Sequence, residues 1–464
     1  MSGNAIKKMY SRKKQKTMKY YSTNHNTQPV TLEEAVTTGL APDRGLYMPE
    51  QIKQLPESFF QNIQDMTFRQ IACCVAENLF GEDIDHDDLQ NIVCDTLSFD
   101  CPVVNISENI WSLELFHGPT LAFKDVGARF MARTLAYFAN KDIRRKKETD
   151  GGNGRSRNVN VLVATSGDTG SAVANGFLNV DGVHVFVLYP KGKVSPIQEC
   201  QFTTLGHNIT ALEVDGTFDD CQSLVKEAFA DNELNEALRL TSANSINVAR
   251  FLPQSFYYFN AYARMKEKGL ADNLVICVPS GNFGNITAGL LAQRMGLPVK
   301  RFIAANNAND VFLQYLKTGV YTPRPSIMTV ANAMDVGAPS NFARIIDIFN
   351  NSHDEICKTI SGCAYSDDEI THAITECYKS YGYILDPHGA CGWLALHENL
   401  TRGEVGVFLE TAHPAKFKNI VERYIGSKVA MPKRLEAFTH GEKQSIQMTA
   451  IFADFKHYLL NNAK

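Results

Sequence analysis

Lys124 stands at a position where a charged lysine is disfavoured and where nucleophilic chemistry is favoured. It follows three apolar residues (Leu121–Phe123) and opens a segment with a helical pattern, KDVGARFMAR. A cation at a helix N-terminus faces the positive end of the helix dipole, at a cost of ~0.3–1 kcal/mol. Apolar neighbours and the dipole both favour the neutral amine, which can attack an aldehyde and form a Schiff base. The alternative is a lysine that extends its amine past an apolar stem into water.

A glycine-containing turn at Ser280–Asn285 (SGNFGN) has the composition of an anion-binding site. It lies between an apolar run and a helical pattern, and Gly281 and Gly284 permit close approach of the backbone. The N-terminus of the following helix offers free N–H groups, which suit a phosphate. The turn matches neither the dinucleotide motif G-x-G-x-x-G nor a Walker A loop. It predicts phosphate binding, although a strand-to-helix turn without a ligand has the same pattern.

A second turn of this kind, Thr165–Gly170 (TSGDTG), carries three hydroxyl side chains and could hold another anion, such as a carboxylate. Two such turns and an amine kept neutral call for a cofactor with both an aldehyde and a phosphate. Pyridoxal phosphate has both groups, with its phosphate in residues 281–285 and its reactive carbon on Lys124. We therefore predict a pyridoxal-phosphate site.

The elements that must position these residues alternate between buried strands and helices. Continuous apolar runs at Val159–Ala164, Val183–Tyr189, Asn273–Ser280 and Glu404–Glu410 are typical of strands in a parallel sheet covered on both faces. In such sheets ligands bind beyond the carboxyl ends of the strands, where both glycine turns lie. Residues 20–109 have a more helical pattern and are predicted to form a separate N-terminal layer.

Composition places the chain among ordinary globular proteins and excludes several functional classes. Of its 464 residues 44% are hydrophobic and 21% charged, and the net charge of -4 favours neither nucleic acid nor an anionic membrane as partner. No apolar run reaches the roughly 20 residues of a membrane span. The eleven cysteines form no C-x2-C pair and the histidines no H-E-x-x-H motif, so we expect reduced thiols, no metal and a cytoplasmic protein.

Two polar segments interrupt this pattern. Residues 1–17 are rich in lysine and arginine, and they are predicted to be a disordered basic tail, with contact to nucleic acid or an anionic surface as the alternative. The segment Asn140–Asn158 is rich in glycine and charge and is predicted to be an exposed, mobile loop.

Several long motifs, in this order, resemble those of the threonine synthase family: LELFHGPTLAFKD, ATSGDTG, SANSIN, VPSGNFGN, NAMDVGAPSN and TAHPAKF. The resemblance covers nearly the whole chain from Met18 and is to the longer microbial and fungal branch. It implies the fold type II architecture of pyridoxal-phosphate enzymes, with two parallel-sheet α/β domains. The implied divisions are an N-terminal mixed domain (18–109), a large domain (110–125 and 246–464) and a small domain (126–245).

The resemblance also assigns roles to residues. Lys124 would carry the cofactor as a Schiff base, and Thr411 would hydrogen-bond the pyridine nitrogen. The residues implied to hold the cofactor phosphate are Gly281, Asn282, Phe283, Gly284 and Asn285. Those implied to bind the α-carboxylate of the substrate are Ser166, Gly167, Asp168 and Thr169.

The reaction implied is O-phospho-L-homoserine plus water giving L-threonine and phosphate, by γ-elimination and β-addition of water, with Lys124 as proton carrier. The substrate phosphate needs its own donors, for which the candidates are Lys193, Ser195, Asn247 and Arg250, arginine being the better bidentate partner. His117 and Thr120 flank the lysine turn and are further candidates for the pocket. The expected partner is this small molecule, and the chain is expected to be a monomer or a homodimer.

Three other functions remain open at the level of sequence. A serine/threonine dehydratase or a cysteine-synthase type of enzyme would share the lysine and the glycine turn without needing a second phosphate pocket. A descendant that binds without catalysis is the second, since a fold alone does not establish chemistry. A nicotinamide-dependent oxidoreductase is the third, and the absence of G-x-G-x-x-G counts against it.

Overall fold

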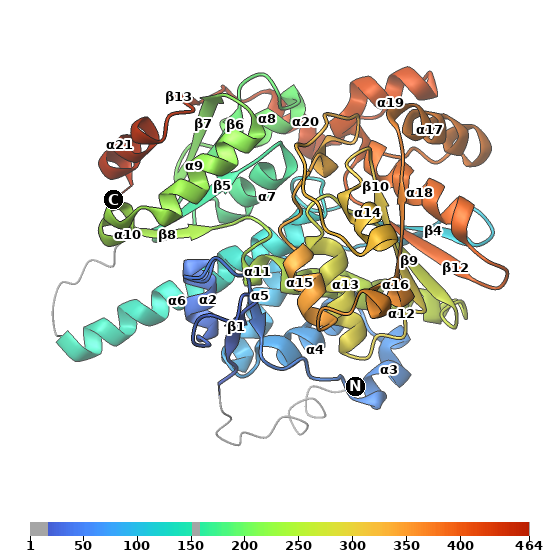
Figure 1. Cartoon of the computed structure of the whole chain (residues 1–464), viewed down its shortest axis with the longest axis horizontal. Helices are drawn as coiled ribbons and strands as arrows, with labels where there is room; N and C mark the ends of the chain where they lie inside the picture. The colour runs from blue at the N-terminus through green and yellow to red at the C-terminus, as the bar shows by residue number, and fades with distance from the viewer. Residues whose placement is uncertain (1–16, 151–157, 464) are drawn as a thin grey trace.

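The computed structural model of the chain describes residues 17–150 and 158–463 (Figure 1). Almost all of the predicted basic tail, and residues 151–157 of the predicted polar loop, therefore lie outside the described residues. Two parallel-sheet units lie side by side, with the N-terminal part of the chain packed beneath them as a largely helical layer (Figure 1).

The larger unit contains a six-stranded sheet in the order β11-β10-β9-β12-β4-β3, in which neighbouring strands are parallel except for β3 and β4. Its strands are β3 (Val103–Asn105), β4 (Ile110–Glu114), β9 (Leu274–Pro279), β10 (Arg301–Asn306), β11 (Ile360–Ala364) and β12 (Val405–Glu410). Every residue of β9 is buried, as the continuous apolar run predicted. Helix α18 (Pro387–Asn399) packs against β9, β10 and β12.

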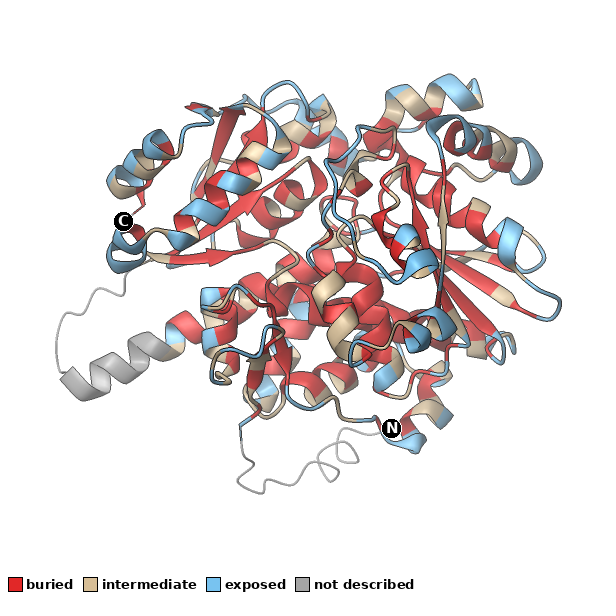
Figure 2. Cartoon of the chain, in the orientation of Figure 1, coloured by how far each residue is buried: buried red, intermediate tan, exposed pale blue. Residues whose placement is uncertain are grey.

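The smaller unit contains a five-stranded, all-parallel sheet in the order β13-β7-β6-β5-β8. Its strands are β5 (Val159–Ala164), β6 (Val183–Pro190), β7 (Ile209–Asp215), β8 (Arg239–Ser242) and β13 (Ile446–Thr449). The helices of this unit are α7 (Asp168–Phe177), α8 (Pro196–Thr203), α9 (Phe218–Ala230), α10 (Asn232–Ala237) and α21 (Phe452–Asn462). Strands β5, β6, β7 and β8 are buried along most of their length, whereas β13 is mostly exposed; α7 is buried nearly all round, and α9 buries one side (Figure 2).

The N-terminal layer consists of a short antiparallel pair, four α-helices and one 3₁₀ helix. The elements are β1 (Tyr20–Ser22), α2 (Leu32–Thr38), β2 (Tyr47–Pro49), α3 (Glu57–Asn62), η1 (Ile63–Asp65), α4 (Phe68–Phe80) and α5 (His86–Thr96). Helix α4 begins with a capping box between Thr67 and Gln70 and packs against α5 and against α12 (Ser255–Glu267) of the larger unit. The predicted separate layer therefore shares its hydrophobic core with the rest of the chain.

The strands depart from the predicted domain boundaries at two places. β3, predicted to be part of the N-terminal domain, pairs with β4 and extends the larger sheet. β13 and α21, predicted to be part of the large domain, return to the smaller sheet, where β13 pairs with β7. Both strands are short, and their partners are set by tertiary contacts rather than by a local pattern.

The predicted loop at Asn140–Asn158 is wrong for its first part. Helix α6 begins at Lys124, as expected, and continues to Asp150. This charge-rich run is therefore helical up to Asp150, because lysine, arginine and glutamate are good helix formers.

The remaining elements lie mainly around the larger sheet. They are α11 (Val248–Phe251), η2 (Leu252–Gln254), α13 (Gly284–Arg294), α14 (Val311–Thr318), η3 (Asn332–Met334), α15 (Phe342–Ile348), α16 (His353–Thr359), α17 (Asp367–Tyr381), η4 (Pro414–Phe417), α19 (Lys418–Ile425) and α20 (Lys433–Thr439). Among the described residues no helix is long and apolar enough to cross a membrane. The same residues contain no group of three or more His, Cys, Asp or Glu side chains that could hold a metal ion.

Candidate active site

A cleft between the two sheets collects the carboxyl ends of strands from both units. Its empty volume is about 870 Å³, including the part open to solvent. Ala164 at the end of β5, Pro279 at the end of β9 and Thr411 directly after β12 all line it. This is the edge at which parallel sheets bind ligands, and it is where the sequence predicted the site.

Lys124 lies in this cleft at the first position of α6. The turn before it is tightly held, because the backbone N–H and the hydroxyl of Thr120 donate to the carboxylate of Asp125 at 2.9 and 2.7 Å. Leu121 adopts the left-handed backbone conformation, with a φ of 59°. On the other side, the N–H of Phe123 donates to the carbonyl oxygen of Thr411 at 2.9 Å. The backbone therefore fixes where the lysine side chain begins.

The environment of Lys124 favours its neutral form. Burial lowers the pKa of Lys124 to about 8; the charges of Lys416 and Arg250 act in the same direction, and the carboxylate of Asp168 opposes them. The amine has no hydrogen-bond partner within the described ranges, and its Nζ lies 5.4 Å from the centre of the Phe123 ring. An unpaired amine with a pKa near 8 is an effective nucleophile toward an aldehyde.

The predicted phosphate turn lies in the same cleft, at the N-terminus of α13. All five residues 281–285 line the cleft, and their backbone N–H groups have no hydrogen-bond partner among residues 17–150 and 158–463. Phe283 has a φ of 61°, and a Cβ at Gly281 would lie 2.6 Å from the Cα of Met334. A run of free N–H groups at a helix N-terminus fits the phosphate of pyridoxal phosphate.

The resemblance implies side-chain as well as backbone donors to the phosphate, but the side chains of Asn282 and Asn285 are engaged elsewhere. Asn282 donates to the hydroxyl of Ser245 at 3.0 Å and accepts from the N–H of Ser340 at 2.6 Å. Asn285 donates to the carbonyl of Pro279 at 2.8 Å and accepts from the hydroxyl of Ser280 at 2.9 Å. The two amides hold the shape of the turn, so the backbone supplies the free donors.

Thr411 offers a third group that fits the cofactor. Its side chain is buried at the cleft wall, and its hydroxyl has no hydrogen-bond partner in the part of the chain that the structure describes. A neutral hydroxyl at this point can pair with a ring nitrogen without holding it protonated.

The four residues 166–169, predicted to bind the substrate carboxylate, lie partly in the cleft and partly outside it. Ser166 and Thr169 line the cleft. Gly167 and Asp168 do not, and the carboxylate of Asp168 turns away to Lys416, whose Nζ lies 2.6 Å from Oδ1. Gly167 has a φ of 143°, and a Cβ there would lie 2.7 Å from the side chain of Gln198. The expectation that all four residues face the substrate is therefore wrong for these two.

Arg250 is the only one of the four candidates for the substrate phosphate that lines the cleft. Its guanidinium is buried and donates to the carbonyl of Ala243, while Nε has no partner among the described residues. Burial lowers the pKa of Arg250 to about 10, with Asp125 acting in the opposite direction. A buried cation with unused donors beside the cleft suits an anionic group.

Asn247 is a structural residue rather than a ligand. Its side chain caps α11 by accepting from the N–H of Ala249 at 3.0 Å, and it donates to the carbonyls of Val36 and Ser242 at 2.9 and 3.1 Å. Because both ends of the amide are used, the expectation for Asn247 is wrong. The motif SANSIN marked a buried cap, which looks the same in sequence as a polar ligand.

Lys193 and Ser195 lie outside the cleft. Lys193 is exposed, and Ser195 caps α8, where it accepts from the N–H of Gln198 and donates to its side-chain oxygen at 2.9 Å. Their predicted role in binding the substrate phosphate is not supported.

His117 and Thr120 also lie outside the cleft. His117 is exposed and pairs with Glu114 at 2.7 Å, whereas Thr120 is buried in the turn that precedes Lys124. Their predicted place in the pocket is wrong, and Thr120 acts instead by shaping the lysine turn.

His388 is a cleft residue that the sequence did not single out. Its Nδ1 pairs with Asp386, the N-cap of α18, and its Nε2 accepts from the N–H of Ala333 at 3.1 Å. These contacts assign the proton to Nδ1. Asp followed by Pro at residues 386–387 marks a helix start, but the contact with residue 333 could not be read from that local pattern. The other cleft residues missed from the sequence include Asn244, Ser245, Gln254, Asn332, Met334 and Asp335.

A buried lysine with a lowered pKa, a turn with free backbone N–H groups and an unpaired hydroxyl lie in one cleft between two sheets. Residues 100–409 match the family described as pyridoxal-phosphate dependent enzyme. The fold and the family match thus define a pyridoxal-phosphate dependent enzyme of fold type II, so the predicted fold class and the predicted cofactor are confirmed.

Similarity to known families and proteins identifies the family of pyridoxal-phosphate dependent enzymes to which the chain belongs. Residues 19–97 match the family described as threonine synthase N terminus, and residues 389–458 match threonine synthase, C-terminal. Threonine synthase of Haemophilus influenzae is 42% identical over 96% of this chain and 100% of its own length. The chain belongs to the threonine synthase family.

Solved structures agree. The crystal structure of threonine synthase from Escherichia coli has a TM-score of 0.88 and 40% identity, over 96% of this chain and 100% of that one. The X-ray structure of pyridoxal-phosphate-bound threonine synthase from Brucella melitensis has a TM-score of 0.87 and 32% identity, over 97% of this chain and 100% of that one.

Proposed function

We propose that this enzyme converts O-phospho-L-homoserine and water into L-threonine and phosphate, with Lys124 as the residue that carries pyridoxal phosphate. The observation that supports this most directly is the unpaired amine of Lys124 in one cleft with the free N–H groups of residues 281–285. These two features suit the two ends of the cofactor. Membership of the threonine synthase family supports the substrate and the reaction.

Bound pyridoxal phosphate supplies an electron sink for the charge that develops when bonds at Cα are broken. The N–H groups of residues 281–285 would hold its phosphate, and the hydroxyl of Thr411 would accept or donate a hydrogen bond at its ring nitrogen. The backbone bond between Phe123 and Thr411 keeps the lysine and the hydroxyl in a fixed relation.

Lys124 would act as the proton carrier once its amine is free. With a pKa near 8, the amine takes up and returns protons close to neutral pH. General acid–base help of this kind contributes ~10²–10⁴ in rate. Water reaches the cleft through the part that is open to solvent, and one water molecule would add at Cβ.

Two groups would bind the charged ends of the substrate. Ser166 and Thr169, at the N-terminus of α7, suit the α-carboxylate, because the helix dipole and the hydroxyls favour an anion. Arg250 suits the γ-phosphate and the phosphate that leaves. A cysteine-synthase or dehydratase type of enzyme would not need a cation such as Arg250 for a substrate phosphate.

Borohydride reduction of the full chain loaded with pyridoxal phosphate tests the site. Reduction fixes the pyridoxyl group on the lysine that carries it, and we expect the label on the tryptic peptide that contains Lys124. Label on another lysine, or none, would remove the basis of the proposal. Lys124→Ala should show no threonine formation, whereas Lys268→Ala, which changes an exposed lysine, should retain it.

Phosphate release distinguishes this function from its rivals of the same fold. We expect O-phospho-L-homoserine to yield equal amounts of phosphate and L-threonine, and L-serine or L-threonine to yield little 2-oxo acid and ammonia. Rapid deamination of serine without use of the phosphorylated substrate would favour a dehydratase.

We propose further that the protein acts in the cytoplasm, without nucleic acid, as a monomer or a homodimer. Its composition and net charge of -4 support the first two parts. Sedimentation of the holoenzyme measures its state of assembly.

A further inference from the structure

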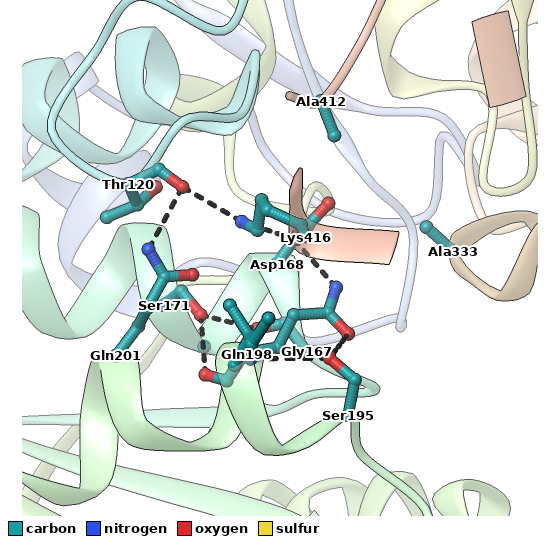
Figure 3. A network of polar contacts seen from close by, with 12 residues as sticks. Thr120, Gly167, Asp168, Ser171, Ser195, Gln198, Gln201, Ala333, Ala412 and Lys416 are labelled. Carbon is teal, nitrogen blue, oxygen red and sulfur yellow. Dashed lines mark hydrogen bonds and ion pairs between the residues drawn. The ribbon is translucent and has the colours of Figure 1, made fainter. Parts of the chain in front are cut away.

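Lys416 is a fully buried lysine that lies outside the cleft yet close to Lys124. Its side chain is 0% exposed, and its Nζ lies 2.6 Å from Oδ1 of Asp168 and 2.9 Å from the carbonyl oxygen of Thr120 (Figure 3). A buried ammonium is costly unless it is paired and hydrogen-bonded, and Lys416 is both.

The contacts of Lys416 join three segments that are distant in sequence. Lys416 belongs to η4, after β12 of the larger sheet, and Asp168 begins α7 of the smaller unit. Thr120 belongs to the turn that precedes Lys124. The ion pair therefore connects the two units behind the reactive lysine.

Residues of α8 complete the network around this pair. Gln198 donates to Asp168 at 2.8 Å and accepts from the hydroxyl of Ser195 at 2.9 Å, and Gln201 donates to the carbonyl of Thr120 at 3.1 Å (Figure 3). Asp168 therefore has a second donor besides Lys416, and its carboxylate is held on the side away from the cleft.

Without its ion pair to Lys416, the negative charge of Asp168 would oppose both the binding of the substrate carboxylate and the neutral form of Lys124. Asp168 lies between Gly167 and Thr169, in the loop proposed to receive the α-carboxylate, and two carboxylates close together repel. It also stabilises the charged form of Lys124. Burial acts to raise the pKa of Asp168, but the charges of Lys416 and Lys124 hold it well below its usual range.

We propose that Lys416 is a positioning residue for the reaction: by pairing with Asp168 it keeps that carboxylate out of the cleft and prevents it from drawing Lys124 into an ion pair. The part that concerns the substrate carboxylate rests on the proposed function. The part that concerns Lys124 rests on the contacts of this chain alone.

Acetylation of the full chain without cofactor tests the effect on Lys124. The neutral amine attacks trace acetic anhydride, an N–C bond forms and acetate leaves, and mass spectrometry reports the extent of reaction on the Lys124 peptide. Lys416→Met should slow this reaction ~3-fold or more, because Asp168 is left to stabilise the ammonium. Asp168→Asn should accelerate it by a similar factor, because the stabilising charge is gone.

The opposite signs separate an electrostatic role from a merely structural one, which would move both variants in the same direction. The double variant K416M/D168N leaves neither charge buried and should lie closer to the wild type than Lys416→Met. Lys418→Met is the matched control, because Lys418 is two residues away and pairs only loosely with Glu422, at 3.6 Å. If Lys416→Met does not fold, Asp168→Asn and the double variant still decide the sign.

Ligand titration of the holoenzyme tests the effect on the carboxylate loop. L-threonine carries the α-carboxylate and L-threoninol lacks it, and the absorbance of the cofactor reports the binding of each. Lys416→Met should weaken L-threonine ~10-fold or more and L-threoninol much less, since repulsion by Asp168 acts on the carboxylate. The double variant should recover most of the loss.

Two results would overturn the proposal: equal changes in Lys124 acetylation for the two single variants, or a double variant no better than Lys416→Met. Failure of the proposed function looks different. In that case borohydride labels a lysine other than Lys124, whatever the acetylation rates are.

Discussion

The N–H of Phe123 donates to the carbonyl oxygen of Thr411 at 2.9 Å, across 288 residues of sequence. Phe123 directly precedes the lysine, and Thr411 directly follows β12. Two further contacts extend this pairing, the bridge between Ala122 and Ala412 and the bond from the N–H of His413 to Leu121 at 3.0 Å. Lys124 and Thr411 are proposed to contact opposite ends of the cofactor ring. The segments that carry them are thus held together by backbone hydrogen bonds, which do not depend on the side chains.

Lys124→Met should stabilise the cofactor-free chain at neutral pH. The pKa of Lys124 is lowered to about 8 from its usual 10.5, so the unfolded chain binds more protons between these values and stability rises with pH there. The cost of burying this lysine is fully present below pH 8 and disappears above about pH 10.5. Urea unfolding of the variant and the wild type should differ by on the order of 1–3 kcal/mol at pH 7 and converge at high pH. A constant difference would contradict the depressed pKa.

Thr411→Val should weaken the cofactor without disturbing its lysine. The change removes the unpaired hydroxyl but keeps the shape of the side chain and the backbone bond to Phe123. One hydrogen bond of ~0.5–1.5 kcal/mol corresponds to a loss of about 2- to 12-fold in affinity for pyridoxal phosphate. Equilibrium dialysis measures the affinity, and Thr411→Ser is the control that should retain it. Equal behaviour of the two variants would remove the hydroxyl from the site.

Gly281→Ala should damage the phosphate turn by overpacking. The added methyl group would lie 2.6 Å from the backbone of Met334, which cannot move aside as a flexible side chain could. Overpacking of this kind costs ~1–3 kcal/mol. We expect a lower unfolding midpoint and weaker binding of pyridoxal phosphate. Gly284→Ala meets only side chains, those of Ser245 at 3.1 Å and Asn341 at 3.3 Å, and should be milder, so a reversed order would contradict the geometry.

Arg250→Gln should raise KM for O-phospho-L-homoserine more than it changes the affinity for the cofactor. A hydrogen bond to a charged group contributes ~1.5–3 kcal/mol, which corresponds to a factor of about 12 to 160. Steady-state kinetics measures KM, and dialysis measures the cofactor. Arg402→Gln is the control on an exposed arginine. An unchanged KM would show that another group binds the substrate phosphate.

His388→Phe should loosen the loop around Ala333. The change leaves the N–H of Ala333 without an acceptor, at ~1–3 kcal/mol, and removes one of the donors to the carboxylate of Asp386, which keeps the backbone N–H of His388 at 2.7 Å. Hydrogen exchange at Ala333 should accelerate and the unfolding midpoint should fall. His397→Phe alters an exposed histidine of the same helix and should do neither.

The parts of the site that lie at the start of a helix could be predicted from sequence. Lys124 and residues 281–285 are marked by local contrast: a cation after apolar residues, and glycines between a buried strand and a helix. These two patterns are informative because a neutral amine and a phosphate-binding turn both depend on backbone geometry and on the adjacent helix terminus.

Residues that bind through polar side chains could not be predicted in the same way. Asn247, Ser195 and Thr120 have the residue types of ligands, and the structure uses them as helix caps and turn supports. His388 is the reverse case: it lines the cleft but was not predicted, because its position depends on a contact with residue 333. A polar side chain satisfies its hydrogen bonds wherever partners are found, so its residue type does not reveal which partners those are.

The sequence by itself determined the class of fold and singled out Lys124 and the turn at residues 281–285, which line one cleft, because burial periodicity and turn chemistry are local properties of the chain. Only the tertiary structure decided that β13 returns to the smaller sheet and that Lys416 neutralises Asp168 between the two units. Both depend on segments more than 200 residues apart, whose approach is set by packing of the whole molecule. The partners of buried charges and short strands are fixed only by this packing, and no local sequence pattern specifies those partners.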